Sequence, residues 1–448
     1  MTPAQSWSLV GGGILLALTF LVFAFRIRSR ERLLELLPTV KTQGVFIGFV
    51  ELKGTAELPQ PLRSFLAEQP CVYYTWEVSE HWSREVQETY TDSEGHTRTR
   101  TKTESGWTPV GGGGEMLDFF LRDDTGVILI NPEKAKIEPV SLVQEVCGPG
   151  DPLYYGKGPA GSISNSDHRR QFVEEAILVG AELYVVGQSR EREDVVALEI
   201  AYDPKAPMFL ISTRGEKAVE SGMGWASWGL ALLGLLVAEA ATFFARAGGP
   251  DLPVRELVLS GAGFALAWGI GWIWMVYNSL VGFRQRVRQA ASLVDVELQR
   301  RHDLIPTLVA AVQGYRDYEA KLQEELAVLR TQGGATRPGE PGPDPVALVP
   351  CVRTITERYP ELKASASFLK LQKSLADTEQ RIALARGYLN GIAQGYNTSL
   401  EVVPDRFVAA LAGLRPQAYF TAGGFERVPV DVDLGRSRPP RAVDRKGS

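Results

Sequence analysis

Residues 257–283 read LVLSGAGFALAWGIGWIWMVYNSLVGF, and this stretch of 27 residues contains no charged side chain. A helix of about 20 apolar residues is long enough to cross the hydrocarbon core of a bilayer. The stretch carries Trp268, Trp272, Trp274 and Tyr277, and such rings favour the headgroup level of a membrane. The stretch therefore predicts a membrane-spanning helix.

Two further apolar runs bring the predicted spans to three. The first run holds no charge, and the second is interrupted only by Glu239. A cleaved signal peptide would need a basic stretch before its apolar core and small residues at a cleavage site. No Lys or Arg precedes the first run, so we interpret it as an uncleaved anchor. The predicted transmembrane helices cover residues 7–25, 222–245 and 257–281.

Arginines set the predicted orientation of these spans. They follow the first span at Arg26, Arg28, Arg30 and Arg32, and the third at Arg284, Arg286 and Arg288. Short loops rich in Lys and Arg stay on the cytoplasmic side of a membrane. We therefore expect the N-terminus outside, and residues 26–220 and everything after residue 283 in the cytoplasm.

Glu239 is a candidate intramembrane carboxylate, which by default suggests a functional site. Its depth offers another interpretation. Counted from Ser221 at 1.5 Å per residue, it lies about 27 Å along the helix, near the outer interface. We favour that second interpretation.

Residues 40–215 predict a β-rich (α+β) cytoplasmic domain, because β-branched and aromatic runs alternate there with Gly, Pro and Asp clusters. Within it, residues 85–104 predict a long hairpin with threonines on one face and basic residues on the other. Such a basic face could contact anionic headgroups, although a solvated hairpin is the favoured interpretation. Gly111 to Gly114 are predicted to form a flexible loop, because no Lys-Ser/Thr pair follows at phosphate-loop spacing.

Four stretches of this region resemble the GIDE, or "beside a membrane", domain. They are GFVELKGTA at 48–56, PCVYY at 70–74, NPEKAKIEP at 131–139 and RRQFVEEAILVGAELYVVG at 169–187. The resemblance implies a domain between two transmembrane helices, followed in the eukaryotic members by a RING finger with ubiquitin-ligase activity. A RING needs eight Cys or His ligands for two zinc ions. This sequence has three Cys and four His, so the ligase function is a disfavoured alternative.

After the third span, apolar residues follow heptad spacing over 287–329 and again over 368–399. Two such stripes predict an all-α antiparallel helical bundle with coiled-coil packing. The third span has no stop signal and should continue into the first stripe. Between the stripes we expect a flexible Gly/Pro-rich loop at 333–345 and a short helix at 346–359.

Pro306 interrupts the first stripe and should kink the helix, with Asp303 as a cap for its restart. The polar residues around this point form a candidate site: Arg301, His302, Asp303, Glu379 and Arg386. They allow two interpretations, an unrecognised enzyme centre or a structural cap, and we favour the cap.

This helical part resembles the LemA family over residues 278–422. The motifs are RRHDLIPTLV at 300–309, YPELKA at 359–364, TEQRIALAR at 378–386 and PQAYF at 416–420. The resemblance implies a multi-pass protein of the bacterial inner membrane, with the N-terminus outside and the helical part in the cytoplasm. It implies no catalytic activity and no cofactor.

Composition limits the remaining functions. The net charge is −5, and residues 283–435 hold 19 Lys and Arg against 18 Asp and Glu, so no basic field predicts nucleic-acid binding. Three scattered cysteines indicate a reducing compartment and predict no metal site. We therefore expect a non-catalytic membrane scaffold whose partners are the lipid bilayer and other proteins or further copies of itself. Residues 436–448 are expected to be a disordered tail.

Overall fold

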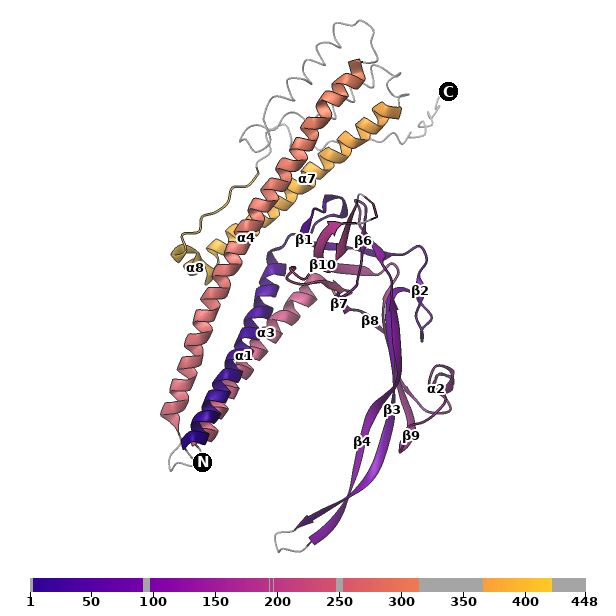
Figure 1. The fold of residues 1–448 in the computed structure, drawn as a ribbon, viewed down its shortest axis with the longest axis vertical. Coiled ribbons are helices and arrows are strands. Elements are labelled where there is room, and N and C mark those ends of the chain that lie inside the picture. Colours follow the sequence, from indigo (N-terminus) through magenta and orange to yellow (C-terminus); the bar gives the residue numbers. More distant parts are fainter. Residues whose placement is uncertain are drawn as a thin grey trace, which may run out of the picture. The chain divides into compact units, whose positions relative to one another are not determined.

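The computed structural model describes residues 3–91, 97–192, 194–195, 197–246, 253–313 and 366–420 (Figure 1). The chain divides into two compact units. The first joins Met1–Ala290 to Gly387–Ala418, and the second joins Ala291–Arg386 to Tyr419–Ser448. The predicted loop at 333–345, the short helix at 346–359 and the tail at 436–448 lie outside the described residues.

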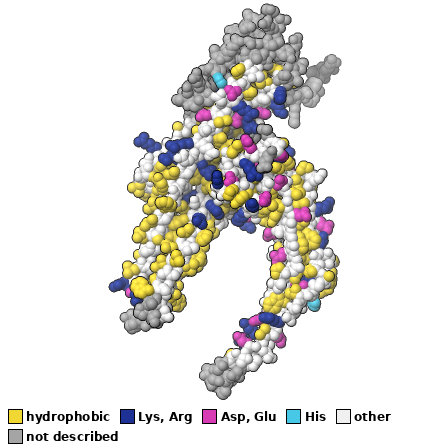
Figure 2. Space-filling view, in the orientation of Figure 1, with side chains coloured by type: hydrophobic (Ala, Val, Ile, Leu, Met, Phe, Trp, Pro, Cys, Tyr) yellow, Lys and Arg dark blue, Asp and Glu magenta, His cyan; other side chains and the backbone are white. Residues whose placement is uncertain are grey.

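Among the described residues, three helices are long and apolar enough to cross a membrane, judged by length and composition. They are α1 (Pro3–Leu36), α3 (Glu216–Arg246) and α4 (Val254–Gln313). The helices predicted at the three apolar runs are thus confirmed, and each extends beyond its run. Figure 2 shows hydrophobic side chains along the outward surfaces of these helices.

Small residues let α1 and α3 approach closely. A Cβ at Gly13 would have no room beside the Ala241 side chain of α3. Ser227 Oγ of α3 donates to the Ala24 carbonyl of α1 at 3.1 Å, so a hydroxyl bonds to backbone inside an apolar contact. These contacts place Ser227 and Ala24 at the same level of the helix pair.

The first sheet of the β-rich region closes on itself like a small barrel. Its seven strands pair in the order β1 (Gly48–Glu57), β5 (Phe119–Arg122), β6 (Val127–Ile130), β11 (Leu198–Ala201), β10 (Glu182–Glu191), β12 (Leu210–Ser212) and β7 (Lys136–Glu138). An antiparallel pairing of β1 with β10 closes a ring of β1, β5, β6, β11 and β10, and β12 and β7 extend the sheet from β10. The inward side chains, among them Val50, Leu121 and Ile200, are fully buried. Closure leaves few unpaired strand edges, which in open sheets promote aggregation.

The second sheet is open and extends into a long ribbon. Its strands are β2 (Leu62–Arg63), β3 (Pro70–Thr91), β9 (Ser166–Leu178) and β8 (Val140–Cys147), with β4 (Thr97–Met116) paired to β3. The helix α2 (Pro152–Gly156) lies between β8 and β9 in the sequence and is capped by the Asp151 side chain, which accepts from the Leu153 amide at 2.8 Å.

The predicted two-faced hairpin is confirmed. Thr99 faces Thr89 across the ribbon, while Arg100 faces Glu88, so threonines and basic residues occupy opposite faces. Arg84 and Glu104 also face each other and form an ion pair at 2.8 Å. The ribbon is longer than the predicted 85–104 because it includes the glycine run.

The prediction of a flexible loop at Gly111 to Gly114 is wrong. These residues lie in β4 and pair with residues 75–78 of β3. Only glycine leaves room at two of these positions. A Cβ at Gly113 would lie 3.1 Å from the Trp76 indole nitrogen, and one at Gly114 would lie 2.5 Å from the Tyr74 carbonyl oxygen. Without side chains of their own, Gly113 and Gly114 allow the Trp76 side chain and the Tyr74 backbone to lie close to β4.

The third apolar helix continues directly into the C-terminal region, as predicted. α4 runs over 60 residues without interruption, from the apolar run to Gln313. The prediction that Asp303 caps a restart is wrong, because Asp303 lies inside the helix and its carboxylate accepts from the Gln299 side chain at 2.8 Å. In the described residues after Gln313, the chain forms α7 (Ala366–Glu401) and α8 (Asp405–Leu411).

Candidate functional site

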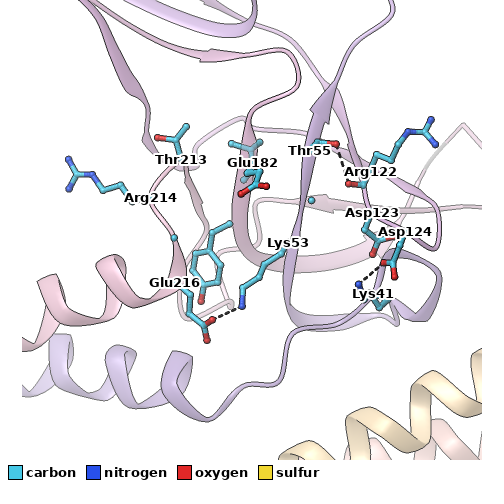
Figure 3. A pocket seen from close by; sticks show the side chains of 14 residues that line it. Lys41, Lys53, Thr55, Arg122, Asp123, Asp124, Glu182, Thr213, Arg214 and Glu216 are labelled. Carbon is cyan, nitrogen blue, oxygen red and sulfur yellow. Dashed lines mark hydrogen bonds and ion pairs between the residues drawn. The ribbon is translucent and has the colours of Figure 1, made fainter.

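An open pocket of about 600 Å³ lies on the barrel, where β1, β10 and the first turn of α3 meet (Figure 3). Its basic lining residues are Lys41, Lys53, Arg122 and Arg214. Its acidic lining residues are Asp123, Asp124, Glu182 and Glu216. Because the two charges balance, the lining indicates neither a purely anionic nor a purely cationic ligand.

Ion pairs across the lining neutralise several of these charges. Lys53 Nζ lies 2.5 Å from Glu216 Oε2, joining β1 to the start of α3, and Lys41 Nζ lies 2.5 Å from Asp124 Oδ1. Both lysines are almost half exposed, and exposed pairs of this kind contribute about 0–1 kcal/mol to stability. Figure 3 shows Arg214 directed away from the Lys53–Glu216 pair.

Asp123 is fully engaged in holding a turn. Its carboxylate accepts from the Thr42 amide at 2.8 Å, from the Thr42 hydroxyl at 2.6 Å and from the Thr125 amide at 2.7 Å. Burial would raise its pKa, but these hydrogen bonds outweigh that effect and lower the pKa to about 2. Asp123 therefore stays ionised as a structural acceptor and is a poor proton donor or acceptor near neutral pH.

Glu51 is a buried carboxylate at the back of this pocket. It is fully inaccessible to solvent, and it accepts from Thr39 Oγ1 at 2.6 Å and from the Tyr184 hydroxyl at 3.1 Å. Lys53 Nζ lies 3.7 Å away. Burial raises the pKa of Glu51 to about 7, with a further contribution from the charge of Glu216 and opposition from the hydrogen bonds and Lys53.

Tyr184 completes this buried group. Burial raises the pKa of its phenol well above the ordinary value, as does the neighbouring Glu51. The phenol thus remains a hydrogen-bond donor throughout the physiological range. Sequence reasoning missed both residues, although a glutamate within the apolar run Phe49–Leu52 was a signal that could have drawn attention to a buried carboxylate.

The described residues hold no cluster of three or more His, Cys, Asp or Glu side chains that could bind a metal ion. Cys71 and Cys147 are buried free thiols. Burial raises the pKa of Cys71 to about 11, so its reactive thiolate form is scarce. The nearest arrangement to an acid–base pair is His81 Nδ1 at 2.6 Å from Asp167 Oδ2, with Arg169 Nη2 also bonded to that carboxylate oxygen at 2.9 Å.

The predicted polar cluster of the second unit is only partly assembled. Arg301 is buried and its Nη1 lies 3.5 Å from Glu379 Oε1, so these two residues do meet. Asp303 bonds to Gln299 instead, and Arg386 stacks over the Phe420 ring at 4.5 Å. His302, between Arg301 and Asp303 in α4, is half-buried. The geometry is that of an ion pair between two helices.

Glu239 lies near the end of α3, half-buried against the next helix. Its Oε1 is 3.2 Å from the point where a Cβ of Gly261 would lie. One turn further along α3, Thr242 Oγ1 lies 3.3 Å from Ser260 Oγ of α4. Glu239 is followed by seven residues of the helix, and its depth in a membrane stays a prediction.

Sequence reasoning also missed a buried ion pair between α1 and α8. Arg32 and Asp405, 373 residues apart in sequence, form a two-pronged contact with an Nη1–Oδ1 distance of 3.2 Å. Both side chains are about nine-tenths buried. No pattern in the sequence links these positions.

Two family models match the chain. The model of the LemA family matches residues 290–434, and the GIDE model, described as E3 ubiquitin ligase, matches residues 87–239. The chain joins a GIDE region to a LemA region. The GIDE match begins inside β3 and ends in α3, whereas the strands of that region begin at Gly48.

The curated relatives that the chain matches include a LemA protein. The chain is 27% identical to Protein LemA of Metamycoplasma hominis over 175 residues, which is 36% of this chain and 78% of the relative. It is 22% identical to Magnetosome proteins MamQ 1 and MamQ 2 of Paramagnetospirillum magneticum over 200 residues, 38% of this chain and 72% of each relative. Together these matches indicate a membrane-associated protein.

Proposed function

We propose that this protein is a non-catalytic scaffold of the bacterial inner membrane, with three spans, an outside N-terminus and both the GIDE and LemA regions in the cytoplasm. It would present the two regions to protein partners or to further copies of itself. The observation that carries the proposal is the unbroken helix α4, which joins an apolar run of membrane-spanning length to the LemA region. A rigid connection of this kind suits a protein that positions binding surfaces.

The site geometry supports a non-catalytic function. Several charges of the pocket on the barrel are paired or used in a turn, and the Arg301–Glu379 contact is a buried ion pair between helices. The E3 ubiquitin ligase description belongs to the matching family model. This sequence, with three Cys and four His, falls short of the eight zinc ligands of a RING.

Cysteine accessibility tests the orientation. In a Cys351→Ser background, where the remaining Cys71 and Cys147 are buried, single cysteines would replace Val254 and Tyr202, which are both exposed. In intact cells a membrane-impermeant maleimide should label Val254→Cys and spare Tyr202→Cys, and disruption of the membrane should expose the second site. Labelling of Tyr202→Cys in intact cells would refute the orientation.

Recovery from native membranes in lipid nanodiscs tests the scaffold role. We expect the full chain to co-purify with a partner protein or as a homo-oligomer, measured by mass photometry and mass spectrometry. A lone monomer from native membranes, with no partner after cross-linking in cells, would contradict the proposal.

A further inference from the structure

The short helix α8 has one buried and one exposed side. Val408 and Ala409 are buried together with Asp405. On the other side Phe407 is 62% exposed and Leu411 is 86% exposed. A soluble surface rarely presents large apolar side chains this openly in one cluster, and such patches mark protein or membrane contacts.

The exposed apolar side is continuous beyond the helix. Val403 lies four residues before Phe407, which lies four before Leu411, and Val402 and Val403 are both more than half exposed. Side chains four residues apart lie on the same face of a helical turn. Phe407 and Leu411 therefore share one face of α8, and Val402 and Val403, in the turn between α7 and α8, add two more exposed apolar side chains just before the helix. The four residues Val402, Val403, Phe407 and Leu411 make up the apolar surface.

Both ends of this segment are fastened to the first unit. At its start, the buried Asp405 pairs with Arg32 of α1. At its end, the Asn397 side chain of α7 forms two hydrogen bonds with the backbone of Gln417. It donates to the Gln417 carbonyl at 2.9 Å and accepts from the Gln417 amide at 2.8 Å. The apolar surface is thus held in place by contacts at its two ends.

The Arg32–Asp405 pair lies at the level of an aromatic belt. The Phe25 ring lies directly against Gly271 of α4, where a Cβ has no room. Arg32 follows Phe25 by seven residues, about 10 Å along α1. Seven residues after Gly271, α4 reaches Asn278. Asn278 follows Tyr277 and lies one turn past Trp274, whose side chain is 72% exposed. Exposed aromatic rings of this kind favour the interface between lipid and water.

Exposed arginines flank the apolar surface in the sequence. Arg406 and Arg415, five residues before and four residues after Leu411, are both exposed, and so is Arg30 of α1, two residues before Arg32. An apolar surface with flanking arginines matches a bilayer, in which an apolar layer lies beneath anionic headgroups.

We infer that α8 lies in the headgroup layer of the inner leaflet and inserts Val403, Phe407 and Leu411 among the lipids, with Arg406 and Arg415 bound to lipid phosphates. The inference rests on the proposed three-span arrangement. It adds a second kind of membrane contact, because the LemA region would then lie on the bilayer surface as well as being joined to a span.

Spin labelling in vesicles tests the inference. The full chain, with Cys351→Ser, would carry a label at Phe407→Cys and be reconstituted in vesicles of phosphatidylethanolamine and phosphatidylglycerol. Leu18→Cys, in the apolar run of α1, provides the lipid reference, and Tyr202→Cys, on the barrel, provides the water reference. Collision with oxygen reports lipid, and collision with a water-soluble nickel chelate reports solvent.

We expect the label at 407 to show strong oxygen collision and a loss of nickel collision relative to 202, and a second label at Leu411→Cys to behave in the same way. Nickel collision at 407 equal to that at 202 would overturn the inference, because the surface would then face water. Shielding from both reagents would also overturn it, in favour of a protein occupant. If the label at residue 18 itself collides freely with the nickel chelate, the three-span arrangement is refuted. The inference about α8, which depends on that arrangement, is then refuted with it.

Discussion

Replacing Glu51 with Gln should change how the stability of the barrel depends on pH. The wild-type carboxyl is completely buried and its pKa is about 7, against an ordinary value near 4.5. A glutamine has nearly the same shape and can still accept from Thr39 and Tyr184, but it never ionises. The variant therefore imitates the protonated wild type at every pH.

The sign of the effect follows from the raised pKa. A group with a higher pKa in the folded state binds its proton more tightly there, so its stabilising contribution is complete below about pH 4.5 and is lost as pH rises through 7. The shift from 4.5 to about 7 corresponds to about 3 kcal/mol at full ionisation. Wild type and Glu51→Gln should thus be similar at pH 5, and the variant should be the more stable at pH 8.

Hydrogen exchange of residues 48–57 measures this locally in the full chain, after correction for the intrinsic pH dependence of exchange. Glu57→Gln is the matched control, because Glu57 lies on the same strand but is exposed and paired with Arg122 at 2.6 Å. A difference between wild type and Glu51→Gln that stays constant from pH 5 to pH 8 would refute the assignment of a raised pKa to Glu51.

Three further substitutions follow from the packing. Arg170→Ala should destabilise the second sheet by about 3–5 kcal/mol in a denaturation assay, because Arg170 is fully buried against Glu80 and donates to three carbonyls. The control is the exposed neighbour, and Arg169→Ala should cost about 0–1 kcal/mol in the same assay. Gly114→Ala should cost about 1–3 kcal/mol and increase protease cleavage of the ribbon, whereas Gly111→Ala, with 3.5 Å to the nearest atom, should leave cleavage unchanged. Arg32→Ala should leave Asp405 buried without its partner, lower the free energy of unfolding by about 3–5 kcal/mol and make residues 402–415 accessible to protease. Arg30→Ala is the exposed control. Equal cleavage in the two variants would contradict a buried pair.

Helices and the two-faced ribbon were predictable because their patterns are local. An uncharged run of 27 residues leaves few alternatives to a helix of membrane-spanning length. Period-two alternation in residues 97–104 likewise fixes which side chains share a face, whatever the rest of the chain does. Such predictions depend only on residues that are neighbours in sequence.

Two predictions failed because the residue preferences they relied on did not decide the local structure. Glycines 111–114 have little strand preference, yet they form a strand because Trp76 and Tyr74 of β3 need the space that a side chain would occupy. Asp303 is a good capping residue, but α4 continues through it and Pro306, so no restart exists for it to cap. Propensity was overruled by packing in the first case and by helix continuity in the second.

Glu51 and the Arg32–Asp405 pair show why the buried polar groups escaped sequence reasoning. The pKa of Glu51 depends on closure of the barrel, which brings Tyr184 of β10 against β1. The ion pair joins residues 373 positions apart. Neither arrangement leaves a local spacing to recognise, so a three-dimensional structure was needed to find them.

The GIDE and LemA regions meet physically within the first unit, and small residues make this possible. A Cβ on Gly391 of α7 would lie 3.1 Å from Pro38, and Gly395 approaches the Leu36 carbonyl in the same way, so the end of α7 lies close to the end of α1. The Tyr388 ring packs at a tilt against Phe46, just before β1, with ring centroids 5.0 Å apart. Since Arg32–Asp405 lies at this junction as well, a partner that moved one region would strain a buried ion pair and a close helix contact. Within the first unit, the end of the LemA region is therefore packed against α1 and the segment before β1, a fixed contact of the kind that a membrane scaffold requires.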